Sequence, residues 1–146
     1  MLNNKDAWFT TFNIIKMLNI KRERLRKWID EGFITPDKKA DGVGTKALFS
    51  LDSVYRIQLF LELLWIGLTR EKAREIAMGI TFKNVGTGND EFKYLTIKTD
   101  KIESRMYSTG VEIEKTMPQI EMENRLSVTV LNLLTIKREV DNSISG

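Results

Sequence analysis

Between residues 21 and 33 the apolar side chains recur at three- and four-residue steps, which places them along one stripe of a helix and its exit turn. Gly32 tolerates a left-handed backbone and Pro36 prevents the helix from resuming, so we expect a helix over residues 21–30. The stripe is expected to face the protein core, and it consists of Leu25, Trp28, Ile29 and Phe33.

A shorter helix is predicted immediately before it. Thr10 or Thr11 can cap this helix, whose apolar positions are Phe12, Ile15 and Leu18 with Ile14 beside them. Asn19 makes the turn, and Ile20 fills the gap between the helices. Two short helices joined by a tight turn predict a helix-turn-helix.

The next segment predicts a loop and two more helices. Residues 36–45 contain a proline, two glycines and several charges, which favours a hairpin tip, and residues 46–49 return as a brief extended segment. Ser50 is expected to cap a long helix that carries Asp52 in its first turn and stops at Gly67. Thr69 is expected to cap the following helix, which Gly79 closes. The apolar interiors are predicted to be Val54, Ile57, Leu61, Leu64 and Trp65, then Ala73, Ile76 and Ala77.

The second half has a different pattern. Residues 79–91 are polar and contain glycine, so we expect a linker. Strands are predicted over residues 92–99, 111–114 and 126–133, and from Leu133 the apolar spacing becomes helical through Ile136, Val140 and Ile144. We therefore expect three parts: a helical N-terminal domain at 1–78, a linker at 79–91 and a small α+β C-terminal domain at 92–146.

Basic residues are concentrated in the first half of the chain, although the formal net charge is only +3. From Lys16 to Lys27 every charged residue except Glu23 is basic. Exposed helix faces are often charged for solubility alone, but this density beside a helix-turn-helix is the local footprint of a phosphate-binding surface.

The absences narrow the function. The chain has no cysteine and no histidine, which removes disulfides, thiolate nucleophiles, the commonest metal ligand and the usual general base at neutral pH. The sequence shows no glycine-rich phosphate loop and no nucleophile elbow either. We therefore expect neither an enzyme nor a cofactor. With 42% hydrophobic and 29% charged residues, no apolar run of membrane-spanning length and no evident signal segment, a cytoplasmic, nucleoid-associated protein is expected.

Five short motifs occur in a characteristic order. They are Phe9-Thr10, Leu25-Arg26-Lys27-Trp28, the Glu-Gly-Phe-Ile-x-Pro exit at residues 31–36, Leu48-Phe49-Ser50, and the Ile-Gly-Leu-Thr-x-Glu turn at residues 66–71. Together they make the segment from about residue 8 to 77 resemble the DNA-binding domain of the MerR family of bacterial transcription regulators. The resemblance implies a mainly α winged helix-turn-helix of four helices plus a small β wing, followed here by the small α+β C-terminal unit.

The resemblance further implies that the second helix enters the major groove of double-stranded DNA while the wing lies on the neighbouring backbone. Arginine presents a fork that matches guanine O6 and N7, and lysine supplies a point charge to phosphate. By position, the resemblance implies that Lys21, Arg22, Arg24 and Arg26 face the groove and that Lys27 and Trp28 flank the phosphates. The other residues expected to contact DNA are Thr11 on the first helix and, on the wing, Lys38, Lys39, Thr45 and Lys46.

Several of these residues also have a structural interpretation. Arg26 could pair with Asp30 one turn on, and Trp28 lies on the apolar stripe, so a core position competes with DNA contact. Lys38 and Lys39 could be ordinary turn residues. Trp65 is expected in the core or in a subunit contact.

The leading prediction is a sequence-specific transcriptional regulator. An architectural, chromosome-anchoring or excisionase-like DNA-binding protein is the first alternative, because the fold suits it too. A protein-interaction adaptor, whose basic face meets an acidic partner, is the second. The sequence leaves open whether the C-terminal unit binds a small-molecule effector, a protein partner or a second copy of the chain as a homodimer; no membrane partner is expected.

Overall fold

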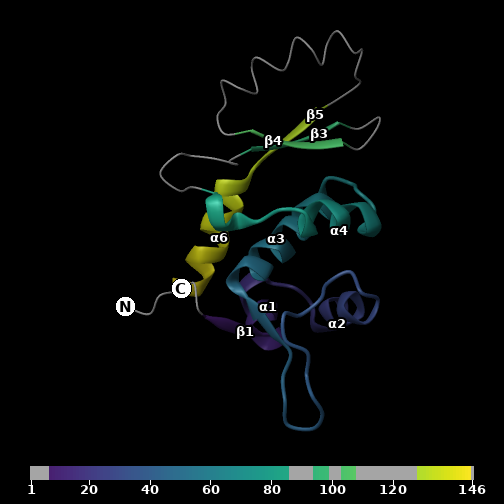
Figure 1. Ribbon diagram of the computed structural model, residues 1–146, viewed down its shortest axis with the longest axis vertical. Helices are drawn as coiled ribbons and strands as arrows, with labels where there is room; N and C mark the ends of the chain where they lie inside the picture. The colour runs from purple at the N-terminus through teal and green to yellow at the C-terminus, as the bar shows by residue number, and fades with distance from the viewer. Residues whose placement is uncertain (1–6, 86–93, 99–102, 108–127, 146) are drawn as a thin grey trace. The chain divides into compact units, whose positions relative to one another are not determined.

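The structure, a computed structural model, describes residues 7–85, 94–98, 103–107 and 128–145 of the 146-residue chain (Figure 1). Its contacts divide these residues into two compact units. The first unit contains residues up to 81 together with those from 139 onward, and the second unit contains residues 82–138. The predicted fold class is confirmed, because a helical first part with a small sheet is followed by a small α+β unit.

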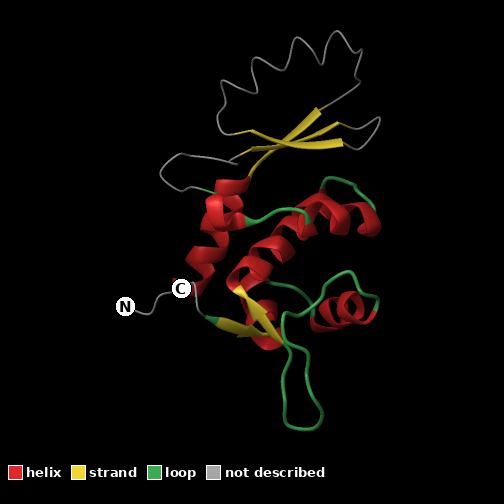
Figure 2. Cartoon of the chain, in the orientation of Figure 1, coloured by secondary structure: helices red, strands yellow, loops and turns green. Residues whose placement is uncertain are grey.

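The first unit is built from four complete helices, the last part of the C-terminal helix and two short strands; Figure 2 shows the helices in red and the strands in yellow. Polar residues that begin the helices explain where they start. Thr10 accepts a hydrogen bond from the N–H of Asn13, Ser50 accepts one from Ser53, and Thr69 accepts one from Lys72, so the caps predicted at these positions are confirmed. In chain order the elements are β1 (Trp8–Thr10), α1 (Thr11–Leu18), α2 (Arg22–Asp30), β2 (Leu48–Ser50), α3 (Leu51–Trp65) and α4 (Arg70–Met78).

A two-stranded antiparallel sheet joins the start of the domain to the end of the wing. β1 pairs with β2, and Phe9 lies opposite Phe49, with both rings buried. The extended segment predicted at residues 46–49 corresponds to β2, whereas β1 was not predicted. Three residues are too few to show an alternating pattern, and the partner strand lies about 40 residues away, so only the tertiary structure reveals the pair.

The core of the first unit collects apolar side chains from every element around α3. Trp28 of α2 packs edge-on against Phe60 of α3, with ring centroids 5.2 Å apart and planes at 84°. Ile14 of α1, Leu25 of α2 and Phe49 of β2 are buried in the same unit. The inward direction predicted for α2 is confirmed for Leu25 and Trp28.

Two residues predicted on the apolar interior of a helix, Phe12 and Trp65, are exposed instead, and the subunit contact that was the alternative for Trp65 stays a prediction. Phe12 is 62% exposed while Ile14 is fully buried, because the two residues lie on opposite sides of α1 and the helix packs through the second. Trp65 is 87% exposed, because the buried stripe of α3 runs through Phe60 and Leu63 and the last residue of the helix points away from it. Both helices have apolar residues on two sides, so spacing alone does not select the buried one.

The second unit contains a three-stranded antiparallel sheet in the order β4-β3-β5. The strands predicted near residues 92–99 and 126–133 are confirmed as β3 (Tyr94–Lys98) and β5 (Val128–Asn132), and the predicted change to a helix at Leu133 is confirmed as α6 (Leu133–Ser145). Asn132 caps α6 by accepting hydrogen bonds from the N–H groups of Leu134 and Thr135. β4 (Glu103–Tyr107) was not predicted. The strand expected at 111–114 lies outside the described residues.

The segment expected to be a polar linker contains apolar anchors. Ile80, Phe82 and Val85 are buried, and a 3-10 turn, η2 (Phe82–Asn84), lies among them. The Lys137 ammonium of α6 donates to the carbonyl of Val85 over 3.0 Å, which ties this segment to the helix within the second unit. Within the described ranges, no helix combines the length and apolar character needed to cross a membrane.

The end of α6 belongs to the first unit, where it meets α3. Tyr55 of α3 is buried, and its hydroxyl donates a hydrogen bond to the carboxylate of Asp141. Val140, one residue earlier on α6, is buried as well. Burial first, and then the hydrogen bond to Asp141, raises the pKa of the Tyr55 hydroxyl above its ordinary value near 10.

We expect Tyr55→Phe to lower the free energy of unfolding by about 1.5–3 kcal/mol at pH 7, because it removes a hydrogen bond to a charged group. The folded state holds the phenol proton more tightly than the unfolded chain does. The contribution is therefore complete below pH 10 and is lost as the pH rises above it. Urea denaturation at pH 7 and at pH 10–11 should show a lower stability for the variant at pH 7 and a shallower alkaline decline. Equal stability and equal decline in both proteins would contradict this role of Tyr55.

Candidate nucleic-acid interface

α2 is held in place at its end by the glycine turn that follows it. Gly32 has φ +82°, and the N–H groups of Phe33 and Ile34 both donate to the carbonyl of Trp28, over 2.9 and 3.2 Å. A φ in this range strains residues that have a Cβ, which is why glycine is needed here. The turn brings Ile34 back into the core, where it is buried.

Two arginines of α4 fix the same turn. The Arg74 Nε donates to the carbonyl of Gly32 over 2.9 Å, and an Arg70 guanidinium nitrogen lies 3.3 Å from a carboxylate oxygen of Glu31. The Arg70 guanidinium also lies 5.8 Å from the centre of the Phe33 ring. The two arginines therefore form contacts within the domain, and these contacts hold the end of α2 against α4.

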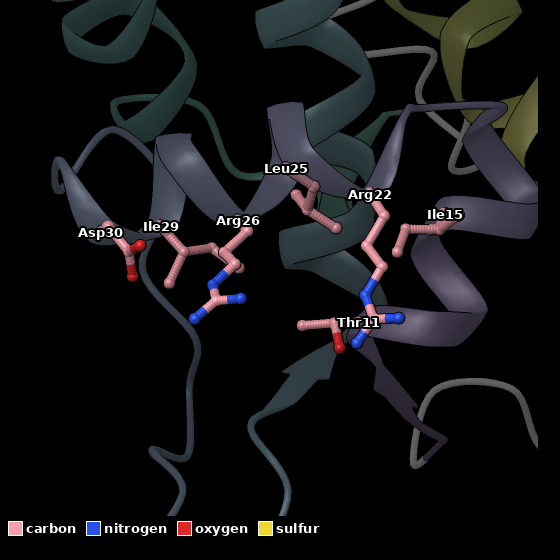
Figure 3. Close-up of a pocket in the computed structure, with 7 residues that line it drawn as sticks. All are labelled: Thr11, Ile15, Arg22, Leu25, Arg26, Ile29 and Asp30. Atoms are coloured by element: carbon pink, nitrogen blue, oxygen red, sulfur yellow. The ribbon is translucent and has the colours of Figure 1, made fainter.

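The cations of α2 point in different directions. Arg22 and Arg26 are one helical turn apart and exposed, and Figure 3 shows their guanidinium groups on the same side of the helix, with Arg22 reaching toward Thr11 of α1. Neither arginine forms an ion pair with any residue that the structure describes. Arg26 and Asp30, both among the described residues, therefore do not form the ion pair that the sequence suggested.

The two arginines border a shallow pocket between α1 and α2 with a volume of about 200 Å³ (Figure 3). Its floor and rim mix guanidinium, hydroxyl, carboxylate and aliphatic groups. The lining residues are Thr11 and Ile15 from α1, and Arg22, Leu25, Arg26, Ile29 and Asp30 from α2. We call the surface formed by Thr11, Ile15, Arg22, Arg26, Ile29 and Asp30 the α2 flank.

The remaining basic residues of α2 lie elsewhere. The Arg24 guanidinium lies 4.7 Å from the centre of the Trp28 ring, in a cation–π arrangement. The Lys27 ammonium lies 3.9 Å from a carboxylate oxygen of Glu31. Lys21 is the exposed N-cap residue, and its side chain makes no capping hydrogen bond. Four residues expected to face one groove thus divide: Arg22 and Arg26 share the α2 flank, whereas Arg24 stacks on Trp28.

Trp28 itself corrects the predicted set. Its ring is only 3% exposed and packs against Phe60, so it contributes to the core and has no surface for a nucleic acid. From the sequence, a core position and a contact with DNA were both predicted for Trp28. The structure decides for the core, because the apolar stripe of α2 turns the ring inward.

The wing emerges from the small sheet and is anchored at its base. The backbone groups of Lys38 and Leu48 exchange hydrogen bonds of 3.0 and 2.8 Å, and an Asp37 carboxylate oxygen accepts the N–H of Ser50 over 2.8 Å. The Lys38 ammonium lies 4.2 Å from the centre of the exposed Trp8 ring. Lys38, which was expected to bind phosphate, therefore contacts Trp8 and Leu48 at the base of the wing.

The wing loop, which we define as residues 39–47, closes on itself at its tip. The hydroxyl of Thr45 donates to the carbonyl of Gly42 over 2.9 Å and accepts the N–H of Asp41. Thr45 thus shapes the loop. Lys39 and Lys46 are exposed and form no ion pair with the described residues, so their charges are available to solvent (Figure 1 shows the loop extending beyond the sheet).

The residue set predicted from sequence missed part of the α2 flank. Ile15, Ile29 and Asp30 line the pocket but were not expected to take part in binding. Ile29 had been placed on the inward stripe, yet it is only half-buried. One signal was present: Arg22, Arg26 and Ile29 follow one another at four and three residues, which is the spacing of a single helix flank.

Comparison with known families agrees with this geometry. Residues 12–79 match the family model described as MerR HTH family regulatory protein. No curated protein matches the chain. The match covers α1, α2, the wing, α3 and α4, and the resemblance predicted from the five motifs is confirmed. Over residues 12–79 the chain is therefore similar to the helix-turn-helix domain of MerR family regulatory proteins.

Proposed function

We propose that this protein is a sequence-specific regulator that inserts α2 into the major groove of double-stranded DNA and rests its wing loop on the neighbouring backbone. The observation that carries the proposal is the α2 flank, where Arg22 and Arg26 hold exposed guanidinium groups on one side of a firmly packed helix. The major groove is about 12 Å wide and admits an α-helix. Leu25 and Trp28 are buried, which supports the flank that carries Arg22 and Arg26 as the one that would meet the bases.

The chemistry of the flank suits base edges. Arginine can donate two parallel hydrogen bonds to guanine O6 and N7, which lysine cannot reproduce. Both guanidinium groups are exposed and hydrated in the free protein. They would lose this water only on binding, when hydrogen bonds to a guanine or a phosphate replace it. We assign Arg22 and Arg26 to base contact.

The start of α2 suits phosphate. α1, α3 and α4 each begin with a side chain that accepts a backbone N–H, whereas the N-cap of α2 is Lys21, whose side chain has no acceptor. A phosphate at this position would interact with the positive end of the helix and with the Lys21 ammonium together. Thr11, at the start of α1, borders the same pocket and can donate its hydroxyl.

A selection of duplexes from a random pool tests the proposal. We expect the full-length protein to enrich a short consensus that contains guanine, with an affinity that falls steeply as salt increases. An adaptor for acidic proteins would retain no duplex with sequence preference, and that result would refute the proposal. A two-fold-symmetric consensus, with the mass of the complex, would also report whether two copies bind.

The wing loop predicts a distinct response to mutation. We expect Lys39→Ala and Lys46→Ala each to weaken binding to all duplexes alike and to reduce the slope of log K against log salt by about one unit, since each removes one phosphate contact. The matched control is Lys72→Ala, which changes the net charge equally but removes a lysine already 3.2 Å from Glu75 on α4. Titrations at four salt concentrations measure the slopes. Equal slopes for all three variants would refute the wing assignment.

A further inference from the structure

The α2 flank contains apolar surface among its cations. Ile15 of α1 and Ile29 of α2 are half-buried and line the same pocket as Arg22 and Arg26 (Figure 3). An isoleucine left partly in water loses hydrophobic stabilisation in proportion to the apolar surface that stays exposed. A ligand that covered these side chains with an apolar group would recover that energy. The ligand should therefore combine an apolar group with hydrogen-bond acceptors.

The size of the pocket limits what can enter. Its volume of about 200 Å³ is below the roughly 300–1,000 Å³ of pockets that enclose drug-sized molecules. The pocket lies between two exposed guanidinium groups, so its ligand must also tolerate or need positive charge. A small-molecule effector is poorly suited to this site, whereas the projecting edge of a base pair is narrow enough to enter.

We infer that the pocket recognises a thymine methyl group next to a guanine in the major groove; this inference rests on the proposed function. The thymine C5-methyl is the apolar group that an unmodified major groove presents, while guanine presents the O6 and N7 acceptors that an arginine fork matches. Ile29 follows Arg26 by three residues, a spacing that leaves their Cβ atoms about 5–6 Å apart on one flank. Base pairs follow one another every 3.4 Å or so along the duplex. The two side chains can therefore reach neighbouring bases.

The isoleucine side chains argue against adenine or cytosine as the base that enters the pocket. Reading adenine in the major groove requires a donor and an acceptor together, as asparagine and glutamine provide, and isoleucine has neither. Asp30 at the rim could accept from cytosine N4, but cytosine carries no methyl group to cover Ile15 and Ile29. Thymine is the base that satisfies the apolar part of the pocket.

The test removes one methyl group at a time. After selection of the consensus, each thymine is replaced singly by deoxyuridine, which keeps base pairing and loses only the C5-methyl. We expect one thymine adjacent to a guanine at which the full-length protein binds the deoxyuridine duplex about four-fold more weakly, the value for one buried methyl-sized group. The same exchange at the other thymines should leave the affinity unchanged.

The matched variants connect this effect to Ile29. We expect Ile29→Ala to bind the thymine and deoxyuridine duplexes equally, and Ile144→Ala, a half-exposed isoleucine of α6 outside the pocket, to keep the four-fold ratio. The ratio compares two duplexes with one protein preparation, so a loss of folded protein does not change it. A consensus without thymine, a ratio near one throughout, or an unchanged ratio in Ile29→Ala overturns the inference while the proposed function stands. If the protein selects no duplex, both fail.

Discussion

Simultaneous replacement of Arg22 and Arg26 by alanine should weaken binding to the selected duplex by roughly 30-fold or more, since each bidentate arginine contact is worth about 1–3 kcal/mol. Both side chains are exposed, line the same pocket and form no ion pair within the described ranges, so their removal should leave the fold intact. Binding to a random duplex should fall much less, because phosphate contacts dominate it. Fluorescence titrations with both duplexes would measure the two effects, and the unfolding midpoint would confirm the fold.

Arg24→Ala is the matched control for that experiment. It removes the same kind of side chain from the same helix, two residues from each of the others, but Arg24 lies over the Trp28 ring and does not line the pocket. We expect a loss of about three-fold or less in specific binding. If Arg24→Ala weakens specific binding as much as Arg26→Ala does, the assignment of the α2 flank is wrong.

Phe60→Ala should lower the free energy of unfolding by about 3–5 kcal/mol, the range for a buried aromatic residue replaced by alanine. Phe60 is fully buried on α3 and packs edge-on against Trp28, so the substitution removes contacts on both helices and leaves a cavity between them. A loss of this size is a large fraction of the stability of a small domain. Urea denaturation followed by tryptophan fluorescence would report it directly.

Trp65→Ala is the control from the same helix. Its ring is 87% exposed, so we expect a change within about 0.5 kcal/mol despite the larger side chain. If the two substitutions destabilise the protein equally, Trp65 is covered by something the exposed fraction does not show, such as a second copy of the chain. A measurement of mass in solution, with and without the substitution, would then separate the two explanations.

The helix-turn-helix was predictable because its signals are local. Thr10, Ser50 and Thr69 each cap a helix within three residues of themselves, and Gly32 ends one through its own backbone angle. Such interactions need no knowledge of the rest of the chain. The order of the five motifs added the relation between the helices, which is why the family resemblance, too, could be seen in the sequence.

The candidate site was predicted less completely. The sequence identified a basic helix, but it grouped Arg24 with Arg22 and Arg26 and left out Ile29. A helical repeat gives the angle between two residues and does not say which side of the helix meets solvent. That choice depended on Phe60, whose ring covers the Trp28 side of α2, and on Thr11, which borders the opposite flank.

The amino-acid sequence by itself determined where the helices of the first unit begin and end, where the switch from strand to helix occurs at Leu133, and that positive charge accumulates on α2. The tertiary structure alone decided the pairing of β1 with β2, the exposure of Trp65, and the contact between Tyr55 and Asp141, 86 residues apart. The difference has one physical reason. Caps, turns and periodicity are satisfied within a few residues, whereas burial and strand pairing depend on partners that only folding brings together.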